Sequence, residues 1–326
     1  MTIGIGLLGP GSIATRAFAP AVRAAAGAEL VAVLSREKAR GQAFAQQFAI
    51  PEVYDDLEAL LRSPRVQAVI VATPDAMHEP QVIAAAQAGK HVLCEKPMTT
   101  TYAGCQRMAA AVRASGITFA MGYTLRFSAA LQRIAALLRA GRIGQVRYAR
   151  AIWTVKGAYG PQAWRAHREQ AHYWALSAVG THLLDLLRWY FGDPASLGGL
   201  LSRPVYHGPN DELSVLVLHY PDRLVAELTA SVLFPGGNRL ELYGEAGTIV
   251  GEQLFGGQQA ATITCNGEPV TCQPGDPFVE EVEDFVQAIV QQRPPRVTLE
   301  DGVRNVAILE TALYGTLQVP LSERTA

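Results

Sequence analysis

The first 122 residues alternate short apolar runs with amphipathic, alanine-rich stretches. Apolar runs of this length predict strands that are buried on both faces of a parallel sheet. The predicted strands are Ile3–Leu8, Leu30–Leu34, Val66–Ala72, His91–Cys94 and Ile117–Gly122. Helices are expected between them, at residues 17–26, 38–48, 57–61, 81–88 and 102–115. This alternation of strands and helices indicates a doubly wound α/β domain.

The pattern changes after Gly122. Leu131, Ile134 and Leu138 recur at helical spacing and predict a helix within residues 126–141. A strand is expected at residues 145–156, and from about residue 200 onward polar and apolar residues alternate. Such alternation predicts antiparallel strands with one covered face, as in residues 224–234.

Turns and helices complete the second half of the chain. Pro235-Gly-Gly and Gly244-Glu-Ala-Gly247 both predict hairpin turns between neighbouring strands. Apolar residues at helical spacing predict two closing helices, one around residues 278–289 and one around residues 303–313.

A glycine-rich turn, Gly9-Pro-Gly-Ser-Ile-Ala14, follows the first predicted strand and precedes an alanine-rich helix. The two glycines permit a tight turn and the close approach of a pyrophosphate, and Ala14 is small enough for the helix to pack on the strand. The N-terminus of the helix attracts phosphates. We therefore predict a dinucleotide site that involves Gly9, Gly11, Ser12, Ile13 and Ala14.

The end of the second strand predicts which dinucleotide binds. A fold of this kind that selects NAD carries an acidic residue there, about 20 residues further on, to bind the ribose hydroxyl. This chain has Ser35 and Arg36 instead. A hydroxyl and a guanidinium can bind a 2′-phosphate, so NADP is expected, with NAD as the second choice. The alternative is that Arg36, with Lys38 and Arg40, belongs to the solvent-exposed face of the next helix.

The fourth strand stops at Glu95, Lys96 and Pro97. Ligands of an open parallel sheet bind outside the carboxyl ends of the strands, so a lysine there faces a bound molecule. The third strand ends at the same edge, because Pro74 cannot continue a central ladder. Lys96 is therefore the first candidate for a chemical role, although a solvated loop lysine is the alternative. The residues expected beside the cofactor are Thr73, Pro74, His78, Glu95 and Lys96.

Four segments together resemble the Gfo/Idh/MocA family, which includes glucose-fructose oxidoreductases and inositol dehydrogenases. They are Gly9–Ala14, Ala72-Thr-Pro with His78, Ala88–Pro97 and Gly180-Thr-His-Leu-Leu-Asp185. The resemblance implies a nicotinamide-dependent oxidoreductase of sugars, sugar derivatives, cyclitols or related carbonyl compounds. It implies a Rossmann domain, expected at residues 1–122, and an α/β domain with a large, mostly antiparallel open sheet, expected at residues 123–326. In family members this sheet often packs against a second subunit, so a homodimer or homotetramer is expected.

The resemblance also assigns roles in the second half of the chain. The family's histidine at the position of His182, with the lysine of the Glu-Lys-Pro segment, contacts the reacting oxygen of the substrate, which gives His182 and Lys96 catalytic roles. Asp185 lies three residues further along the same predicted helix, so its carboxylate can orient the imidazole. Alone, a histidine on a leucine-rich helix is more often structural. Trp164 and Arg165 are expected at the cofactor, and Tyr123, Arg126, Arg165 and Asp185 at the substrate.

Two positions depart from the family pattern. Many members have an aspartate two residues before the glycine of the second motif, where this chain has Ala178. The pocket then lacks a carboxylate for a polyol hydroxyl, which argues against an inositol-like substrate. Asp75 stands where many relatives have asparagine, a change that affects the capping of the loop.

The composition excludes several other functions. The net charge is -1 and there is no long basic run, so the sequence does not predict a basic surface that would bind nucleic acid or an anionic membrane. No segment approaches the ~20 apolar residues of a membrane span. The four cysteines form no Cys-x-x-Cys pair, which favours reduced thiols in a cytoplasmic protein and argues against a metal site. A small-molecule substrate is therefore expected.

The predicted reaction is hydride transfer between the nicotinamide and a secondary alcohol or its ketone, with Lys96 and His182 moving the proton or holding the oxygen. Burial and an oxidised nicotinamide both disfavour the charged form of Lys96. Two alternatives stay open, a non-catalytic NADP-binding sensor and a glycosidase that uses tightly held NAD. The sequence names neither the substrate nor the direction of the reaction.

Overall fold

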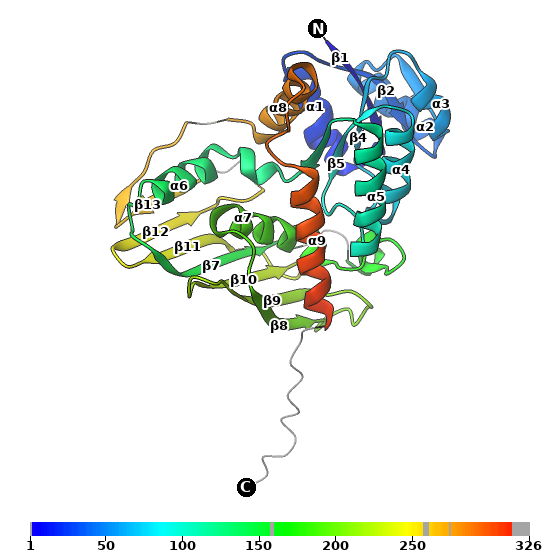
Figure 1. The fold of residues 1–326 in the computed structure, drawn as a ribbon. Coiled ribbons are helices and arrows are strands. Elements are labelled where there is room, and N and C mark those ends of the chain that lie inside the picture. The colour runs from blue at the N-terminus through cyan, green and yellow to red at the C-terminus, as the bar shows by residue number, and fades with distance from the viewer. Residues whose placement is uncertain (1, 157–159, 257–260, 274, 315–326) are drawn as a thin grey trace. The chain divides into compact units, whose positions relative to one another are not determined.

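The computed structural model describes residues 2–156, 160–256, 261–273 and 275–314 (Figure 1). The chain forms two compact units, each built on its own sheet. The first unit runs to Arg133 and adds Glu169–His172 and Cys272–Ala307, and the second unit holds the rest of the described chain. The first unit therefore extends beyond the boundary expected after Gly122. It takes in a helix from late in the sequence because that helix packs its apolar side into the core beside the first strand.

The first unit contains a six-stranded parallel sheet in the order β3-β2-β1-β4-β5-β6. Its strands are β1 (Ile3–Leu8), β2 (Ala28–Leu34), β3 (Glu52–Tyr54), β4 (Ala68–Val71), β5 (His91–Glu95) and β6 (Phe119–Gly122). The strand order reverses between β1 and β4, and such folds bind dinucleotides outside the carboxyl ends of the strands at this point. The predicted Rossmann arrangement is confirmed.

Helices cover both faces of this sheet. One apolar cluster contains side chains of α1 (Ala19–Ala24), α2 (Lys38–Phe48) and α8 (Pro277–Gln291). The other contains side chains of α3 (Leu57–Arg62), α4 (Asp75–Gln87), α5 (Tyr102–Ser115) and the first part of α9 (Leu299–Tyr314). Burial on both faces explains why the strand sequences are continuously apolar rather than alternating.

Local caps at both ends explain why the bounds of α5 were predicted correctly. The hydroxyl of Thr101 accepts a hydrogen bond from the amide of Gly104, which caps the start of α5. Gly116 ends the helix in the left-handed conformation, with φ of 68°. The predicted bounds of α5, and those of α2, agree with the structure.

Two elements of the first unit differ from the prediction. The strand β3 was missed because it has only three half-buried residues at the edge of the sheet. The helix α4 begins at Asp75 rather than Gln81. Pro80 lies inside α4, where it removes a backbone hydrogen bond. Because a proline usually interrupts a helix, the start of α4 was predicted only after Pro80. His78 therefore lies on a helix and not in a loop.

The second unit contains an eight-stranded sheet in the order β14-β13-β12-β11-β7-β10-β9-β8. All of its strand pairs are antiparallel except the pair of β10 with β7. The strands are β7 (Val146–Thr154), β8 (Ser196–Ser202), β9 (Leu213–His219), β10 (Val225–Ser231), β11 (Asn238–Gly244), β12 (Gly247–Glu252), β13 (Thr262–Cys265) and β14 (Glu268–Pro269). The prediction of a large, mostly antiparallel sheet is confirmed.

One of the two predicted hairpins is wrong. Gly244 and Gly247 do join the antiparallel pair β11 and β12. Pro235-Gly-Gly does not join neighbouring strands, because β7 lies between β10 and β11 in the sheet. The connection from β10 therefore crosses over a strand that comes from much earlier in the chain, and a local turn signal cannot reveal that.

The helix α7 (Thr181–Phe191) lies across one face of this sheet (Figure 1). The alternate residues Leu224, Ala226, Leu228, Ala230 and Val232 are all buried, as their pattern predicts. A π-helical turn, Leu176–Gly180, leads into α7. A Cβ on Gly180 would lie 3.1 Å from the Cβ of Ala230, so the glycine allows this turn to pack closely on β10.

The helix predicted within residues 126–141 is shorter than expected. A 3₁₀ turn at Thr124–Phe127 comes first, and α6 (Ala129–Arg139) follows it. Ser128 has an extended conformation and separates the two. Among the described residues, no helix is long and apolar enough to cross a membrane.

Glu281 of α8 is a buried acid in the first unit. Its two carboxyl oxygens lie 3.0 and 3.1 Å from the hydroxyl oxygen of Thr124. Burial raises the pKa of Glu281 well above its usual value, the charge of Glu95 adds to this rise, and the hydrogen bond from Thr124 opposes it. The folded protein therefore holds the proton of Glu281 more tightly than the unfolded chain does.

We expect Glu281→Gln to raise the melting temperature at neutral pH. With a raised folded pKa, Glu281 adds stability that is fully present below its unfolded pKa of about 4.3 and is lost as the pH rises through the folded value. Glutamine keeps the shape and cannot ionise, so the gain should shrink as the pH falls towards the unfolded pKa. Thermal unfolding of both proteins across pH measures the difference. The neighbouring Glu280→Gln, at a partly exposed site, should show no such trend, and a destabilised Glu281→Gln at neutral pH would contradict the account.

Candidate active site

Gly9 brings the ends of β1 and β4 together. It has φ of +89°, a conformation that side chains disfavour, and its amide donates to the carbonyl of Leu34 at 3.1 Å. A Cβ there would lie 2.8 Å from Cγ2 of Thr73 and 3.1 Å from the carbonyl oxygen of Ala72. Only glycine therefore lets the turn after β1 lie against the residues that follow β4.

Gly11 leaves open space over the same turn. A Cβ on Gly11 would meet nothing closer than the carbonyl oxygen of Gly9, at 4.0 Å. The helical backbone begins at Ser12, next to Ile13, and Ala14 is fully buried against the sheet. An exposed backbone at the start of a helix suits a pyrophosphate, because the unpaired amides and the helix dipole attract the anion. These residues fit a bound dinucleotide.

The end of β2 carries a serine and exposed arginines. Ser35 is buried, and its hydroxyl donates to the carbonyl of Glu37 at 2.9 Å. Arg36 is exposed. Arg40, which was considered only in the alternative of a solvent-exposed helix face, donates from Nε and a terminal nitrogen to the carbonyl of Pro10, at 3.2 and 3.0 Å. This guanidinium therefore spans from α2 to the glycine turn.

Arg40 is the residue in this region whose position sequence reasoning missed. The available signal was its spacing, because it lies about one helical turn beyond Ser35 and Arg36. That spacing alone does not distinguish a solvated arginine from one that folds back over the glycine turn.

His78 links the loops that follow β4 and β5. Its ring is fully buried, and its Nε2 and Nδ1 lie 2.9 Å from the carbonyl oxygens of Thr73 and Pro97 respectively. Thr73 is also held by its hydroxyl, which donates to Gln81 at 2.7 Å. His78 thus holds the two loops together, and its direct contact with the cofactor stays a prediction.

Lys96 follows the last residue of β5 and is buried. Its backbone amide donates to the carboxylate of Glu95 at 2.9 Å, so Glu95 fixes the main chain from which the lysine extends. Gly122 at the end of β6 lies close by, since a Cβ there would be 3.2 Å from Cα of Glu95. The first unit therefore brings Lys96 to the same edge of its sheet as the glycine turn, Thr73 and Pro74.

Tyr123 and Arg126, which were expected at the substrate, bind α9 within the first unit. The Tyr123 hydroxyl accepts from Nδ2 of Asn305 at 2.7 Å, and Arg126 forms a 2.9 Å ion pair with Asp301. Burial alone would raise the pKa of Asp301, but Arg126 and the hydrogen bonds from Thr298 outweigh it and lower the pKa. Both predicted residues are buried and have structural contacts, and a contact with substrate stays a prediction.

The second unit holds the remaining predicted residues. His182 and Asp185 both lie on α7 and are buried, and the ring centroid of His182 is 5.4 Å from that of Trp153 on β7. Arg165 lies over the ring of Trp164 at 4.0 Å, and its Nε donates to the hydroxyl of Ser177 at 3.4 Å.

The predicted site residues thus fall into two groups, one in each unit. The first unit gathers the glycine turn, the serine and arginine after β2, and the two loops that His78 links. The second unit holds the histidine that the family resemblance implies and the arginine that was expected at the cofactor and substrate. The predicted residues of the first unit are Gly9, Gly11, Ser12, Ile13, Ala14, Ser35, Arg36, Thr73, Pro74, His78, Glu95, Lys96, Tyr123 and Arg126, and those of the second are Trp164, Arg165, His182 and Asp185.

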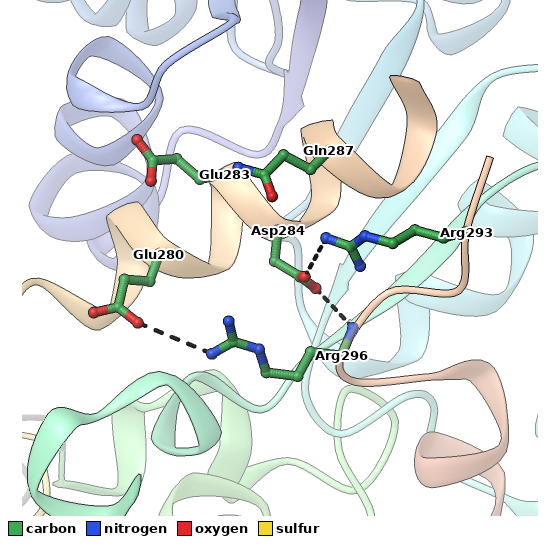
Figure 2. Close-up of a pocket in the computed structure, with 6 residues that line it drawn as sticks. All are labelled: Glu280, Glu283, Asp284, Gln287, Arg293 and Arg296. Carbon is green, nitrogen blue, oxygen red and sulfur yellow. Dashed lines mark hydrogen bonds and ion pairs between the residues drawn. The ribbon is translucent and has the colours of Figure 1, made fainter. Parts of the chain in front are cut away.

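A polar hollow of about 260 Å³ lies along α8 but contains none of these residues (Figure 2). Asp284 accepts from Arg293 at 2.8 Å and from the backbone amide of Arg296 at 2.7 Å, as Figure 2 shows. Arg296 also faces Glu280 at 4.0 Å. Both arginines of the hollow pair with acids of α8, so these ion pairs fasten α8 to the segment that leads to α9.

Two family models match the chain. Residues 3–123 match an oxidoreductase family with an NAD-binding Rossmann fold, and residues 131–250 match the GFO/IDH/MocA C-terminal domain. The chain is 29% identical over 309 residues to 1,5-anhydro-D-fructose reductase of Ensifer adhaerens, a match that covers 93% of this chain and 92% of that protein. It is 32% identical over 263 residues to inositol 2-dehydrogenase of Acidothermus cellulolyticus, which covers 76% of this chain and 72% of that protein.

Solved structures agree with this match. The aldose-aldose oxidoreductase of Caulobacter crescentus, complexed with glycerol, has a TM-score of 0.90 at 26% identity and covers 97% of both chains. A 3-ketoreductase of Actinomadura kijaniata, in complex with NADP and TDP-benzene, has a TM-score of 0.88 at 26% identity and covers 97% of this chain and 98% of that chain.

These matches extend over both units of the protein. The predicted fold class, the NAD(P) cofactor and the oxidoreductase class are therefore confirmed. The chain belongs to the GFO/IDH/MocA family of NAD(P)-dependent oxidoreductases.

Proposed function

We propose that this protein transfers a hydride between NADP(H) and a secondary alcohol, or the corresponding ketone, of a sugar or sugar derivative. The observation that carries the proposal is the position of Lys96, a buried lysine just beyond β5 at the edge of the sheet where the glycine turn lies. Relatives named for anhydrofructose, inositol and D-xylose support a sugar-like substrate. When bound, the nicotinamide supplies or accepts the hydride.

The side chains of the protein supply proton transfer and orientation. Lys96 gives a proton to the substrate oxygen in reduction and takes it back in oxidation. His182 holds the same oxygen, and Asp185 orients the imidazole. Trp164 and Arg165 hold the nicotinamide end of the cofactor or the substrate. Ala178 provides no carboxylate for a polyol, so we propose a carbonyl sugar derivative rather than an inositol.

We expect Lys96→Ala to abolish turnover and to leave the affinity for NADPH within about tenfold, because the variant loses proton transfer and keeps the phosphate contacts. A panel of 1,5-anhydro-D-fructose, D-xylose and myo-inositol, assayed by the absorbance of the reduced cofactor, measures the first effect. Fluorescence titration with NADPH measures the second.

Lys90 provides a matched control at the opposite end of the same strand. Its ammonium donates to the carbonyls of Val66 and Ser63 at 2.6 and 3.3 Å, so Lys90→Ala should lower stability and keep kcat. Full activity of Lys96→Ala would refute the proposed role. If the natural protein binds NADPH and turns over none of these sugars, the alternative of a non-catalytic sensor gains support.

For the cofactor, we propose a preference for NADP through Arg36 and Arg40. The Ser35 hydroxyl already donates to Glu37, so arginines remain as the donors for a 2′-phosphate. Arg40 contributes most, because its bonds to Pro10 place the guanidinium beside the glycine turn. No carboxylate directly follows β2 to repel the phosphate, so NAD binds as well, but less tightly.

NADPH should bind about ten- to a hundredfold more tightly than NADH. The ratio of the two affinities should fall as salt is added, because salt screens the charge of the 2′-phosphate. Arg40→Ala should weaken NADPH binding and change NADH binding little. Lys38→Ala removes an exposed cation from the same helix and should leave the ratio unchanged. Nicotinamide fluorescence gives the affinities of all three proteins for both cofactors. Equal binding of the two cofactors by the natural protein would show that neither arginine binds a 2′-phosphate.

A second copy of the chain is the proposed partner, bound through the open face of the eight-stranded sheet. Leu200, Val217, Val225 and Tyr243 are large apolar side chains on this face, and each is at least 36% exposed. Arg150 lies among them and pairs with Glu227 at 3.3 Å and Glu241 at 3.8 Å. An apolar face with internally paired charges suits contact with an identical surface.

Light scattering of the purified protein should therefore give the mass of a dimer or tetramer. Val217→Glu puts an unpaired charge on the proposed interface and should yield monomers. Val290→Glu makes the same change at an exposed valine of α8 and should leave the mass unchanged. A natural protein that is monomeric at micromolar concentration would rule out the interface.

We also propose that the protein works in the reducing cytoplasm. None of its four cysteines, all of which lie in described residues, forms a disulfide bond, and three of them are buried. Buried cysteines without disulfide bonds are typical of proteins in a reducing compartment.

A further inference from the structure

Three consecutive buried residues of the second unit, Asn210, Asp211 and Glu212, precede β9. Buried polar side chains are nearly always hydrogen-bonded, so each of these three residues is expected to have hydrogen-bond partners. The partners lie in three different segments of the unit. Two of those segments carry predicted site residues, and the third carries none.

Asp211 binds the start of the helix that carries His182. Its carboxylate accepts from the amides of Trp174 at 2.7 Å and Leu176 at 2.9 Å, and its carbonyl accepts from the amide of Ala175 at 2.9 Å. Three successive amides are thus held by one residue. The first amides of a helix have no partner within the helix, and the local cap residue, Ala175, offers no side chain for them. Asp211 supplies that cap from a distant point of the sequence.

The carboxylate is itself held in place. The hydroxyl of Ser214 donates to Asp211 at 2.7 Å. Burial raises the pKa of the Asp211 carboxyl, and the hydrogen bonds from Ser214, Leu176 and Trp174 oppose this rise. The helix start can therefore shift only if several hydrogen bonds break together.

Asn210 binds the turn that carries Arg165. Its Nδ2 donates to the carbonyl oxygen of Arg165 at 2.7 Å. The side chain of Arg165 in turn contacts Ser177, one residue beyond the last amide that Asp211 binds. The neighbours Asn210 and Asp211 therefore fix the two predicted site segments of this unit relative to each other.

Glu212 serves a different segment. Its carboxylate accepts from the amides of Val205 and Tyr206, both at 2.8 Å, in the connection after β8. No predicted site residue lies in that connection. Glu212 is therefore a matched control, since it is equally buried, carries the same charge and lies next to Asp211 in the chain.

We propose that Asp211 and Asn210 are the positioning residues of the second unit's part of the active site: Asp211 sets the place of His182, and Asn210 sets the place of Arg165. The inference rests on the proposed function, in which His182 holds the reacting oxygen. Sequence reasoning missed both residues, because their partners lie about 35 to 45 positions away in the chain.

A double-mutant cycle on the full-length protein tests this inference, with NADPH and the sugar panel as probes. His182→Ala should lower kcat by about 10²- to 10⁴-fold. Asp211→Asn presents an amide group to one of the two backbone donors, and it should lower kcat by about ten- to a hundredfold without weakening NADPH binding. In the His182→Ala background, the same Asp211→Asn change should have almost no further effect, because its effect acts through His182. Glu212→Gln should lower the melting temperature and leave kcat and KM unchanged.

The outcomes separate this inference from the proposed function. No turnover of any sugar would overturn both. Full kcat in His182→Ala would overturn the proposed role of His182, and this inference with it, and would leave the proposed hydride transfer standing. A folded Asp211→Asn with full kcat, or with the same loss in both backgrounds, would overturn the positioning role alone. If Asp211→Asn does not fold, Asn210→Leu decides: it should raise KM about tenfold with little change in kcat, and an unchanged KM would overturn the inference.

Discussion

The close contact between Gly9 and the residues after β4 is the constraint on which the first unit's site depends. It places the glycine turn against Thr73, whose carbonyl faces His78, and the other nitrogen of His78 faces Pro97, next to Lys96. A continuous series of short contacts therefore runs from the glycine turn to the residue after Lys96. Because each contact involves the backbone or a buried ring, the fold and not flexible side chains fixes the place of the Lys96 backbone relative to the glycine turn.

In the second unit, buried polar side chains rather than a glycine turn hold the segments that carry the predicted site residues. Asp211 caps the helix of His182 and Asn210 holds the turn of Arg165. In both units, hydrogen bonds from other residues hold the segments that carry the proposed reacting groups. Loss of such a residue should change rates more than it changes the affinity for the cofactor.

The sequence predicts those parts of the fold that local patterns determine. The helix α5 has its cap and its terminal glycine next to the segment itself, and the continuous apolar runs of the first unit are typical of strands that are covered on both faces. The crossover at Pro235 and the start of α4 before Pro80 depend on distant partners, so turn and proline signals were misleading there. The candidate site residues also differ in how far the sequence predicts them. A local motif identifies Gly9, and the end of a predicted strand identifies Lys96. Local spacing cannot identify the partners of Arg40, Tyr123 and Asp211.

We propose that the protein transfers a hydride to a sugar carbonyl, with proton transfer by Lys96. The most direct measurement is the mass of the sugar product after reaction with NADPH that carries deuterium at both C4 positions of the nicotinamide. A ketose or related carbonyl sugar should gain a single deuterium at carbon, and Lys96→Ala should give no such product while it still binds the cofactor. No transfer of deuterium to any carbonyl sugar tested, or equal transfer by Lys96→Ala, would contradict this proposal.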